Sequence, residues 1–357
     1  NMDDNNNKIK INMLSMADSV DGQGVGSAYL ELMKLLNEDG KNDFEIFLNK
    51  GTKYDVIHAH TVEPRNYLKL KFSKNPTVAY VHFLPDTLDG SIKLPKPIFK
   101  IFKKYVISFY KSADYLVVVN PIFKKDIAKA GIKEDKITYI PNFVSKEMFY
   151  KKTDKEIKDI RKKLGIKENK FVVLGAGQIQ NRKGVIDFVE VAKKLPKIDF
   201  IWAGGFSFGG ITDGHHDLKK IMENPPKNVR FLGIVPRNEM NDLFNASDLL
   251  FVPSYNELFP MTILEAISTD TPILLRDLEL YEDILFKKYL KGSNNDEFSE
   301  IIKLLSKDKK EYQKQVENAK EISEFYSKEH VYKMWKEFYT EIAKKKKKEK
   351  KKRKKSE

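Results

Sequence analysis

Residues 254–265 read Ser-Tyr-Asn-Glu-Leu-Phe-Pro-Met-Thr-Ile-Leu-Glu, and this stretch decides the fold of the chain. The apolar residues 248–253 before it predict a buried strand that ends at a proline. Residues 261–268 have helical spacing, and Pro260 stands at the helix entrance, where a missing amide hydrogen costs nothing. Free N–H groups and the positive end of the helix dipole therefore predict a phosphate site around residues 259–262.

Two glutamates flank this predicted anion site. Glu257 precedes it and Glu265 lies about two turns along the helix, so one carboxylate can reach a sugar and the other a ribose on the opposite side of the phosphate. An ordinary turn with two surface glutamates is the alternative, because this spacing is common in a chain rich in acidic residues. The strand before the turn and the apolar segment 271–275 after the helix favour the functional interpretation.

Length and composition limit the class of protein. The chain has 357 residues and no cysteine, which fits two domains in a reducing compartment. The acidic start does not resemble a secretion signal, and no apolar run reaches the length of a membrane span. Residues 344–357 contain eleven Lys or Arg and two Glu, so they carry +9 of the net charge of +14. Such a basic segment is expected to be disordered and to bind nucleic acid or anionic lipid.

Strands and helices alternate along the chain, which predicts two doubly wound α/β domains that face a cleft. We expect an N-terminal domain at residues 8–145, a C-terminal domain at 146–325, a crossing helix at 326–343 and a tail at 344–357. The expected strands cover residues 8–14, 54–60, 77–83, 115–119, 137–140, 171–177, 199–204, 229–232, 248–253 and 271–275.

A second helix entrance, which carries basic residues, follows the strand predicted at 171–177. Arg182 and Lys183 open the next helix, where they can neutralise a diphosphate without a metal. The chain contains no Asp-X-Asp sequence, the usual carboxylate pair for a Mn²⁺-bound nucleotide sugar. The sequence therefore predicts a diphosphate site with no metal and no cofactor.

Residues 90–113 contain six lysines and no acidic residue. On a helical wheel, Ile98, Ile101, Phe102, Tyr105 and Phe109 form one apolar stripe, which is typical of a helix on an anionic bilayer surface. A domain helix that packs this stripe on a sheet is the alternative, and periodicity does not separate the two. The lysines on the opposite face are Lys96, Lys100, Lys103, Lys104 and Lys111.

The chain resembles the retaining glycosyltransferases of family 4, which have the GT-B fold of two Rossmann-like domains and a C-terminal helix that crosses back to the first. Glu257 and Glu265 with seven residues between them, and Arg-Lys-Gly at 182–184, carry the resemblance over nearly the whole chain before the tail. The bacterial glycolipid branch, notably the diglucosyldiacylglycerol synthases, is most similar, through residues 10–14 with 22–29, 80–91 and 202–209. Two departures are Gln178 for an arginine and Asp270 for a glycine, although aspartate tolerates the left-handed conformation.

The resemblance implies transfer of glucose from UDP-glucose to the membrane glycolipid monoglucosyldiacylglycerol, by a peripheral enzyme on the cytoplasmic face of the cell membrane. Glu257 would orient the hexose, Lys183 would contact the donor phosphate, and His82 would lie beside the transferring sugar. His58 and His60, at the end of another strand, are expected to be structural. The residues implied in donor binding are Gly24, Arg182, Lys183, Ile234, Phe259, Pro260, Met261, Thr262 and Glu265.

Two other functions remain open at this point. A GT-B hexosyltransferase could act on a polyprenyl lipid or a polysaccharide. A nucleic-acid-binding protein is suggested only by the basic tail, which lacks interleaved aromatic residues. We expect no specific nucleic acid as a partner, because that function leaves the two glutamates unexplained.

Overall fold

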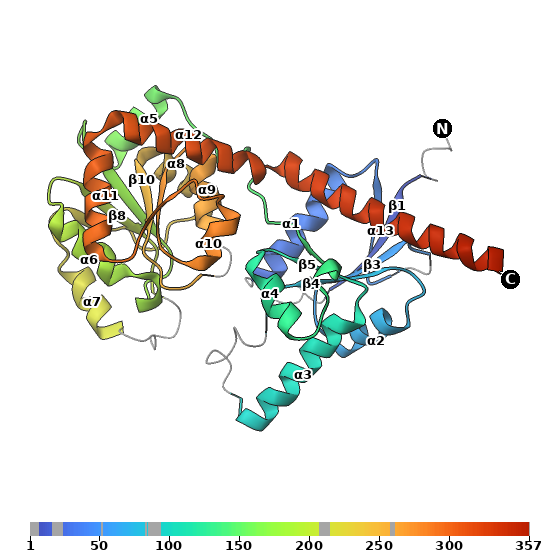
Figure 1. Ribbon diagram of the computed structural model, residues 1–357. Helices are drawn as coiled ribbons and strands as arrows, with labels where there is room; N and C mark the ends of the chain where they lie inside the picture. Colours follow the sequence, from blue (N-terminus) through green and yellow to red (C-terminus); the bar gives the residue numbers. More distant parts are fainter. Residues whose placement is uncertain are drawn as a thin grey trace. The chain divides into compact units, whose positions relative to one another are not determined.

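The computed structural model describes residues 7–15, 24–50, 53–82, 84, 94–206, 215–257 and 261–356. The chain divides into two units, which are treated separately: unit 1 comprises Asn1–Asn142 and Lys328–Glu357, and unit 2 comprises Phe143–Ser327. Each unit is built on a six-stranded parallel sheet flanked by helices (Figure 1). The boundaries predicted at 145/146 and 325/326 lie close to the ends of unit 2.

Unit 1 has the strand order β2-β1-β3-β4-β5-β6. Strand order therefore reverses between β1 and β3, the type of switch point where open α/β sheets bind ligands. Its elements are β1 (Ile9–Leu14), α1 (Gly24–Glu38), β2 (Phe44–Leu48), β3 (Val56–Ala59), α2 (Pro64–Phe72), β4 (Thr77–Val81), α3 (Lys96–Ser112), β5 (Tyr115–Val118), α4 (Ile122–Lys129), the short 3-10 helix η4 (Glu134–Lys136), β6 (Ile137–Tyr139) and α13 (Lys328–Ser356).

Unit 2 has the order β12-β11-β10-β7-β8-β9, so its switch point lies between β7 and β10. Its elements are α5 (Asp154–Lys163), β7 (Val172–Ala176), the 3-10 helix η5 (Asn181–Lys183), α6 (Val185–Lys194), β8 (Asp199–Ala203), α7 (His215–Glu223), β9 (Val229–Phe231), α8 (Arg237–Ala246), β10 (Leu249–Val252), α9 (Met261–Ser268), β11 (Ile273–Arg276), α10 (Glu279–Ile284), β12 (Leu290–Gly292), α11 (Asn295–Lys307) and α12 (Lys309–Phe325).

The two parallel sheets confirm the predicted doubly wound α/β architecture. Aromatic side chains fill the core of unit 2, where Phe188 packs edge-to-face against Phe200 and Trp202. Gly175 in β7 is required by this packing, because a Cβ atom there would lie 2.4 Å from the Trp202 ring. Tight ring packing thereby fixes β7, whose carboxyl end leads to the predicted donor loop.

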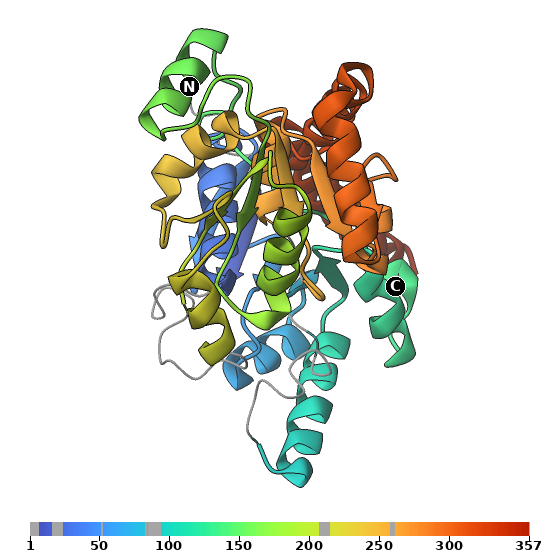
Figure 2. The same cartoon turned by 90° about the vertical axis from the view of Figure 1, so that its left-hand side faces the viewer.

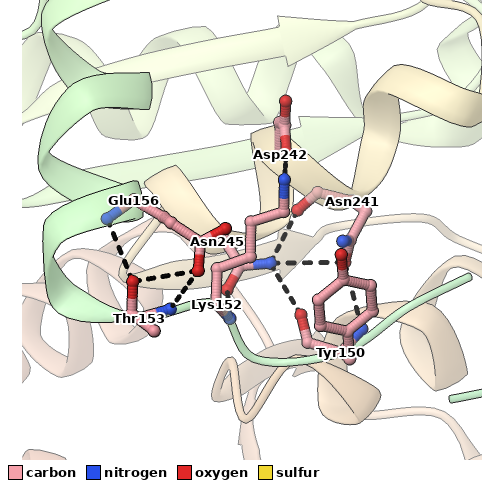
Figure 3. Close-up of polar contacts among 7 residues, drawn as sticks. All are labelled: Tyr150, Lys152, Thr153, Glu156, Asn241, Asp242 and Asn245. Carbon is pink, nitrogen blue, oxygen red and sulfur yellow. Dashed lines mark hydrogen bonds and ion pairs between the residues drawn. The ribbon is translucent and has the colours of Figure 1, made fainter. Parts of the chain in front are cut away.

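The segment before α5 is anchored on α8. Asn245 donates from Nδ2 to the Tyr150 carbonyl at 2.9 Å and accepts from the Lys152 N–H at 2.8 Å (Figure 3). Thr153 then forms a capping box with Glu156 at the start of α5, which satisfies free amides at the helix start. The chain therefore enters unit 2 along a fixed path beside α8.

Helix α13 returns the chain to unit 1 and packs there through its aromatic residues. Trp335 stacks with Tyr80 of β4 at a ring separation of 6.1 Å, and Tyr339 contacts His58 of β3, which confirms the predicted crossing helix. The prediction of a disordered tail at 344–357 is wrong for the described residues, because α13 continues to Ser356. Lys, Arg and Glu are good helix formers, and no Gly or Pro interrupts them.

Helix α3 projects from unit 1 beside α2, as both views show (Figure 1, Figure 2). Its second half packs inward: Val106, Phe109 and Tyr110 are buried. In its first half, Ile98 and Ile101 are 51% and 69% exposed. The packing interpretation therefore holds for the second half of the stripe, and the first half remains a free apolar face. No helix in the described part of the chain combines the length and the apolar character needed to span a bilayer.

Candidate donor-sugar site

Lys183 and Glu257 meet at the switch point of unit 2. Lys183 ends η5 after β7, and Glu257 lies in the loop after β10. The Lys183 Nζ atom is 2.8 Å from Glu257 Oε1, and both side chains are largely buried. Gly177 packs beside this lysine with a φ of +129°, a backbone conformation that residues with a side chain rarely adopt. A paired cation and carboxylate thus occupy the switch point, where proteins with this sheet topology bind their ligands.

Arg182 ties the two loops together. Its Nη1 atom donates to both the backbone carbonyl and the side-chain oxygen of Asn256, each at 3.1 Å, and its own carbonyl accepts from the Tyr255 N–H at 2.9 Å. The sequence predicts contact with a diphosphate for this arginine. In the structure its side chain contacts the loop that carries Glu257, and the contact with a diphosphate stays a prediction.

A small cavity of about 260 Å³ adjoins this site at the ends of β7, β8 and β9. Ile234, one of the residues implied in donor binding, lines it and is 75% exposed. Gly204 allows the two loops to approach, since a Cβ atom there would lie 1.9 Å from the Gly177 carbonyl oxygen. The other lining residues are Gln178, Ala203, Gly205, Phe206, Val235 and Met240.

Helix α9 carries the second glutamate of the predicted motif. It begins at Met261, and the Glu265 carboxylate lies 4.0 Å from Arg237 Nε of α8. Met261 and Thr262 are half-buried in the first turn, while Phe259 and Pro260 lie outside the described residues. After the helix, Asp270 has a φ of +62°, which confirms that aspartate adopts the left-handed conformation of the glycine it replaces.

Three histidines lie among aromatic rings at the carboxyl ends of β3 and β4 in unit 1. His58 and His60 are buried, and His58 Nδ1 is 2.6 Å from the Tyr339 hydroxyl, which fits the structural role expected for this pair. Burial lowers the pKa of His58 to about 3 and lowers the pKa of His60 well below its ordinary value. Both rings are therefore neutral at physiological pH.

His82 is the histidine of this group that follows β4. Its ring stacks on Tyr80 at 4.3 Å, and burial lowers its pKa to about 4. Among the described residues, its buried Nε2 atom has no hydrogen-bond partner. Gly24 begins α1, but the rest of the predicted glycine-rich loop lies outside the described residues.

The lysines predicted to contact a membrane all lie on α3. Lys96, Lys100, Lys104 and Lys111 are exposed, and Lys103 is half-buried. These lysines, His82 and Gly24 belong to unit 1, whereas the predicted site residues from Arg182 onward belong to unit 2. Among the described residues, no group of three or more His, Asp or Glu side chains is arranged to hold a metal ion.

A further group of residues behind the loops was not predicted. Arg276 at the end of β11 contacts Asp187, Tyr255 and the Pro253 carbonyl. Arginine after an apolar strand is a detectable signal, but its partners are up to 89 residues away in sequence, so the sequence alone could not show the cluster.

Two doubly wound parallel units with a lysine–glutamate pair at one switch point define a GT-B glycosyltransferase. Residues 156–322 match the family described as "Glycosyl transferases group 1", and residues 41–147 match "Glycosyltransferase Family 4". In the comparison with solved structures, HepE of Anabaena in complex with UDP superimposes with a TM-score of 0.71 and 18% identity, covering 94% of this chain and 100% of that one.

Curated relatives agree with this classification. The chain is 48% identical over 334 residues to an alpha-galactosylglucosyldiacylglycerol synthase of Streptococcus pneumoniae, covering 93% of this chain and 89% of the relative. It is 29% identical to a processive diacylglycerol alpha-glucosyltransferase of Acholeplasma laidlawii, covering 90% and 94%. The chain therefore belongs to the GT-B glycosyltransferase family that these two domain matches and the 48% identical relative share.

Proposed function

We propose that the protein transfers a hexose from a UDP-sugar to the sugar of glucosyldiacylglycerol, with retention of the anomeric configuration. The observation that carries the proposal is the Lys183–Glu257 pair, 2.8 Å apart at the switch point of unit 2. The name of the 48% identical relative supports the proposed acceptor, because it describes a galactosylglucosyldiacylglycerol product.

Each group of the site has a role in this reaction. Lys183 stabilises the negative charge that develops on the UDP leaving group, together with the N–H groups in the first turn of α9. Glu257 accepts hydrogen bonds from the hexose hydroxyls, and Glu265 from the ribose. The base occupies the cavity beside Ile234, and the neutral His82 ring hydrogen-bonds the transferring sugar. Arg182 holds the Glu257 loop through Asn256.

Two hexoses are candidates for transfer. The family resemblance implies UDP-glucose, and the 29% identical relative is named as an alpha-glucosyltransferase. The 48% identical relative is named for an alpha-galactosyl product. The higher identity ranks UDP-galactose first and UDP-glucose second.

A donor and acceptor panel tests the proposed function. UDP-galactose and UDP-glucose are offered with diacylglycerol, glucosyldiacylglycerol, a polyprenyl diphosphate sugar and an oligosaccharide, and products are separated and their linkages assigned by NMR. We expect an α-linked disaccharide on diacylglycerol. A product on the polyprenyl lipid or oligosaccharide alone would assign a different acceptor, and a β-linked product would contradict retention.

Transfer is expected to need no divalent metal. The chain has no Asp-X-Asp sequence, and Lys183 provides the positive charge that a metal would otherwise supply to the diphosphate. Activity measured after dialysis against excess EDTA should equal activity with added Mg²⁺ or Mn²⁺. A strict requirement for either ion would show that the donor diphosphate is bound elsewhere.

We further propose that α3, together with α2, holds unit 1 against an anionic membrane surface. Ile98 and Ile101 on α3 are exposed among lysines, and Leu68 and Phe72 on the adjoining α2 are 55% and 73% exposed. The two helices pack through Tyr67 and its contacts with the α3 rings. Apolar side chains flanked by lysines fit the boundary between head groups and acyl chains.

Charge reversal of Lys100, Lys103 and Lys104 to glutamate tests this surface. A lysine near an anionic leaflet contributes about 1 kcal/mol, so the loss of three should weaken vesicle binding by at least roughly 100-fold while activity on a detergent-solubilised acceptor persists. The control reverses Lys125, Lys129 and Lys133, which are exposed lysines elsewhere in unit 1. Equal binding of both variants in a vesicle sedimentation assay would contradict the proposal.

A further inference from the structure

Four chain segments of unit 2 converge on the guanidinium group of Arg276. Its Nε atom donates to the Pro253 carbonyl after β10 at 2.8 Å. Its Nη2 atom lies 3.2 Å from Asp187 Oδ2 in the first turn of α6, and its Nη1 atom lies 3.5 Å from the Ser293 carbonyl after β12. Arg276 itself ends β11, so this one side chain joins the carboxyl-end connections of neighbouring strands.

Tyr255 links this cluster to the donor loop. The Arg276 guanidinium lies 3.9 Å from the centroid of the Tyr255 ring, and the Tyr255 hydroxyl donates to Asp187. Asp187 also accepts from Asn295 Nδ2 at 3.0 Å. The planar guanidinium is suited to this arrangement, because it stacks on an aromatic ring while donating in its own plane.

The same contacts fix the distance between the two residues of the donor site. The Tyr255 backbone N–H donates to the Arg182 carbonyl, directly before Lys183, and Glu257 follows two residues after Tyr255. Gly184, directly after Lys183, packs on Pro253 so closely that a Cβ atom would lie 2.5 Å from the Pro253 carbonyl oxygen. That carbonyl is the one to which Arg276 donates.

We propose that Arg276 is a positioning residue, which acts with Asp187 and Tyr255 to hold Lys183 and Glu257 in register for sugar transfer. This inference rests on the proposed function of the donor site. A charged pair enclosed in this way contributes little net stability compared with apolar residues of the same size. Its position at the strand ends beside the switch point, where ligands bind, instead indicates a role in geometry.

The test compares Arg276→Lys with Arg161→Lys. Arg161 is a matched control in the same unit, because it is half-buried, paired with Asp248 at 2.7 Å and bonded to the Ala246 carbonyl at 3.0 Å. Asp248, however, precedes β10 and lies at the opposite end of that strand from Pro253. Both variants keep the charge and lose the planar fork, so only a positioning role at the donor site separates their kinetics.

We expect Arg276→Lys to lower kcat roughly 10- to 100-fold with little change in the donor KM, the scale of a small misplacement of reacting groups. Arg161→Lys should retain the parent kcat even if its Tm falls by the same amount. A parent-like kcat in Arg276→Lys would overturn the inference.

Tyr255→Phe decides the matter if Arg276→Lys does not fold. This substitution removes the hydroxyl that donates to Asp187 but keeps the ring at the half-exposed surface. A several-fold loss of kcat at unchanged Tm supports the inference, and a parent-like kcat overturns it. The parent protein is assayed first: absence of hexose transfer there overturns the proposed function, whereas an active parent with unaffected variants overturns only the role of Arg276.

Discussion

Replacing Lys183 with alanine is expected to lower kcat/KM for hexose transfer roughly 30- to 1000-fold, which corresponds to a loss of about 2–4 kcal/mol of transition-state stabilisation. The ammonium group is held 2.8 Å from Glu257 in a largely enclosed position. A preorganised cation in such a place costs no reorganisation when charge develops on the leaving UDP, and its interactions are weakly screened by water. Steady-state kinetics with the UDP-sugar and a soluble acceptor measure the effect.

Glu257→Gln and Lys193→Ala complete this experiment. Removing Lys183 leaves the Glu257 carboxylate without its cation, so part of the loss in Lys183→Ala can come from an unpaired charge. The double variant Lys183→Ala/Glu257→Gln separates the two terms, because it removes both charges. Lys193 is an exposed lysine of α6, and among the described residues its ion pair is with the neighbouring Glu190. Its replacement by alanine should leave kcat/KM unchanged. Turnover of Lys183→Ala equal to that of Lys193→Ala would refute the donor-site assignment.

Sequence patterns predict every strand of the two sheets that the structure describes except β2 and β12. The segments around β7 and β10 are continuous apolar runs, because central strands of parallel sheets are buried on both faces. The two strands that were missed, β2 and β12, each lie at the end of their sheet. In β2, Glu45 interrupts the apolar pattern and most residues are half-buried, while β12 has three residues. Edge position alone does not explain the two omissions, because the edge strands β6 and β9 were predicted from residues 137–140 and 229–232. What β2 and β12 lack is a distinct, uninterrupted apolar run.

The donor site was predictable as a set of residues and not as an arrangement. Strand-turn-helix context selects Lys183, Glu257 and Glu265 from sequence, since helix entrances in α/β folds bind anions. The contact of Arg182 with Asn256 and that of Arg276 with Asp187 join residues more than 70 positions apart. Such contacts depend on which strands become neighbours in the sheet, and local pattern does not contain that order.

Acid is expected to unfold unit 1 through its three neutral histidines. Burial lowers the pKa of His58 to about 3 and that of His82 to about 4, and it lowers the pKa of His60 as well. In the unfolded chain each histidine has a pKa near its ordinary value of 6.5. Between that pH and the folded-state pKa, the unfolded state binds more protons, so stability falls as pH falls.

The magnitude follows from this proton difference. Each histidine costs about 1.4 kcal/mol per pH unit below 6.5, so His58 and His82 together remove about 4 kcal/mol of stability between pH 7 and pH 5. His60 adds a further loss of the same sign. Burial also raises the pKa of the neighbouring Tyr80 and Tyr339, which therefore stay neutral throughout this range. A loss of this size is a large share of the usual stability of a domain.

The two tryptophans allow each unit to be followed separately. Trp335 packs on the histidine cluster of unit 1, and Trp202 lies in the core of unit 2. In the Trp202→Phe variant, the fluorescence of Trp335 reports the urea unfolding of unit 1. The free energy of unfolding of unit 1 should fall by several kcal/mol between pH 7 and pH 5. Adding His82→Gln should reduce that slope by about 1.4 kcal/mol per pH unit, because one proton-binding difference is removed. An unfolding midpoint for Trp335 that is the same at both pH values would mean that the buried histidines do not control the acid stability of unit 1.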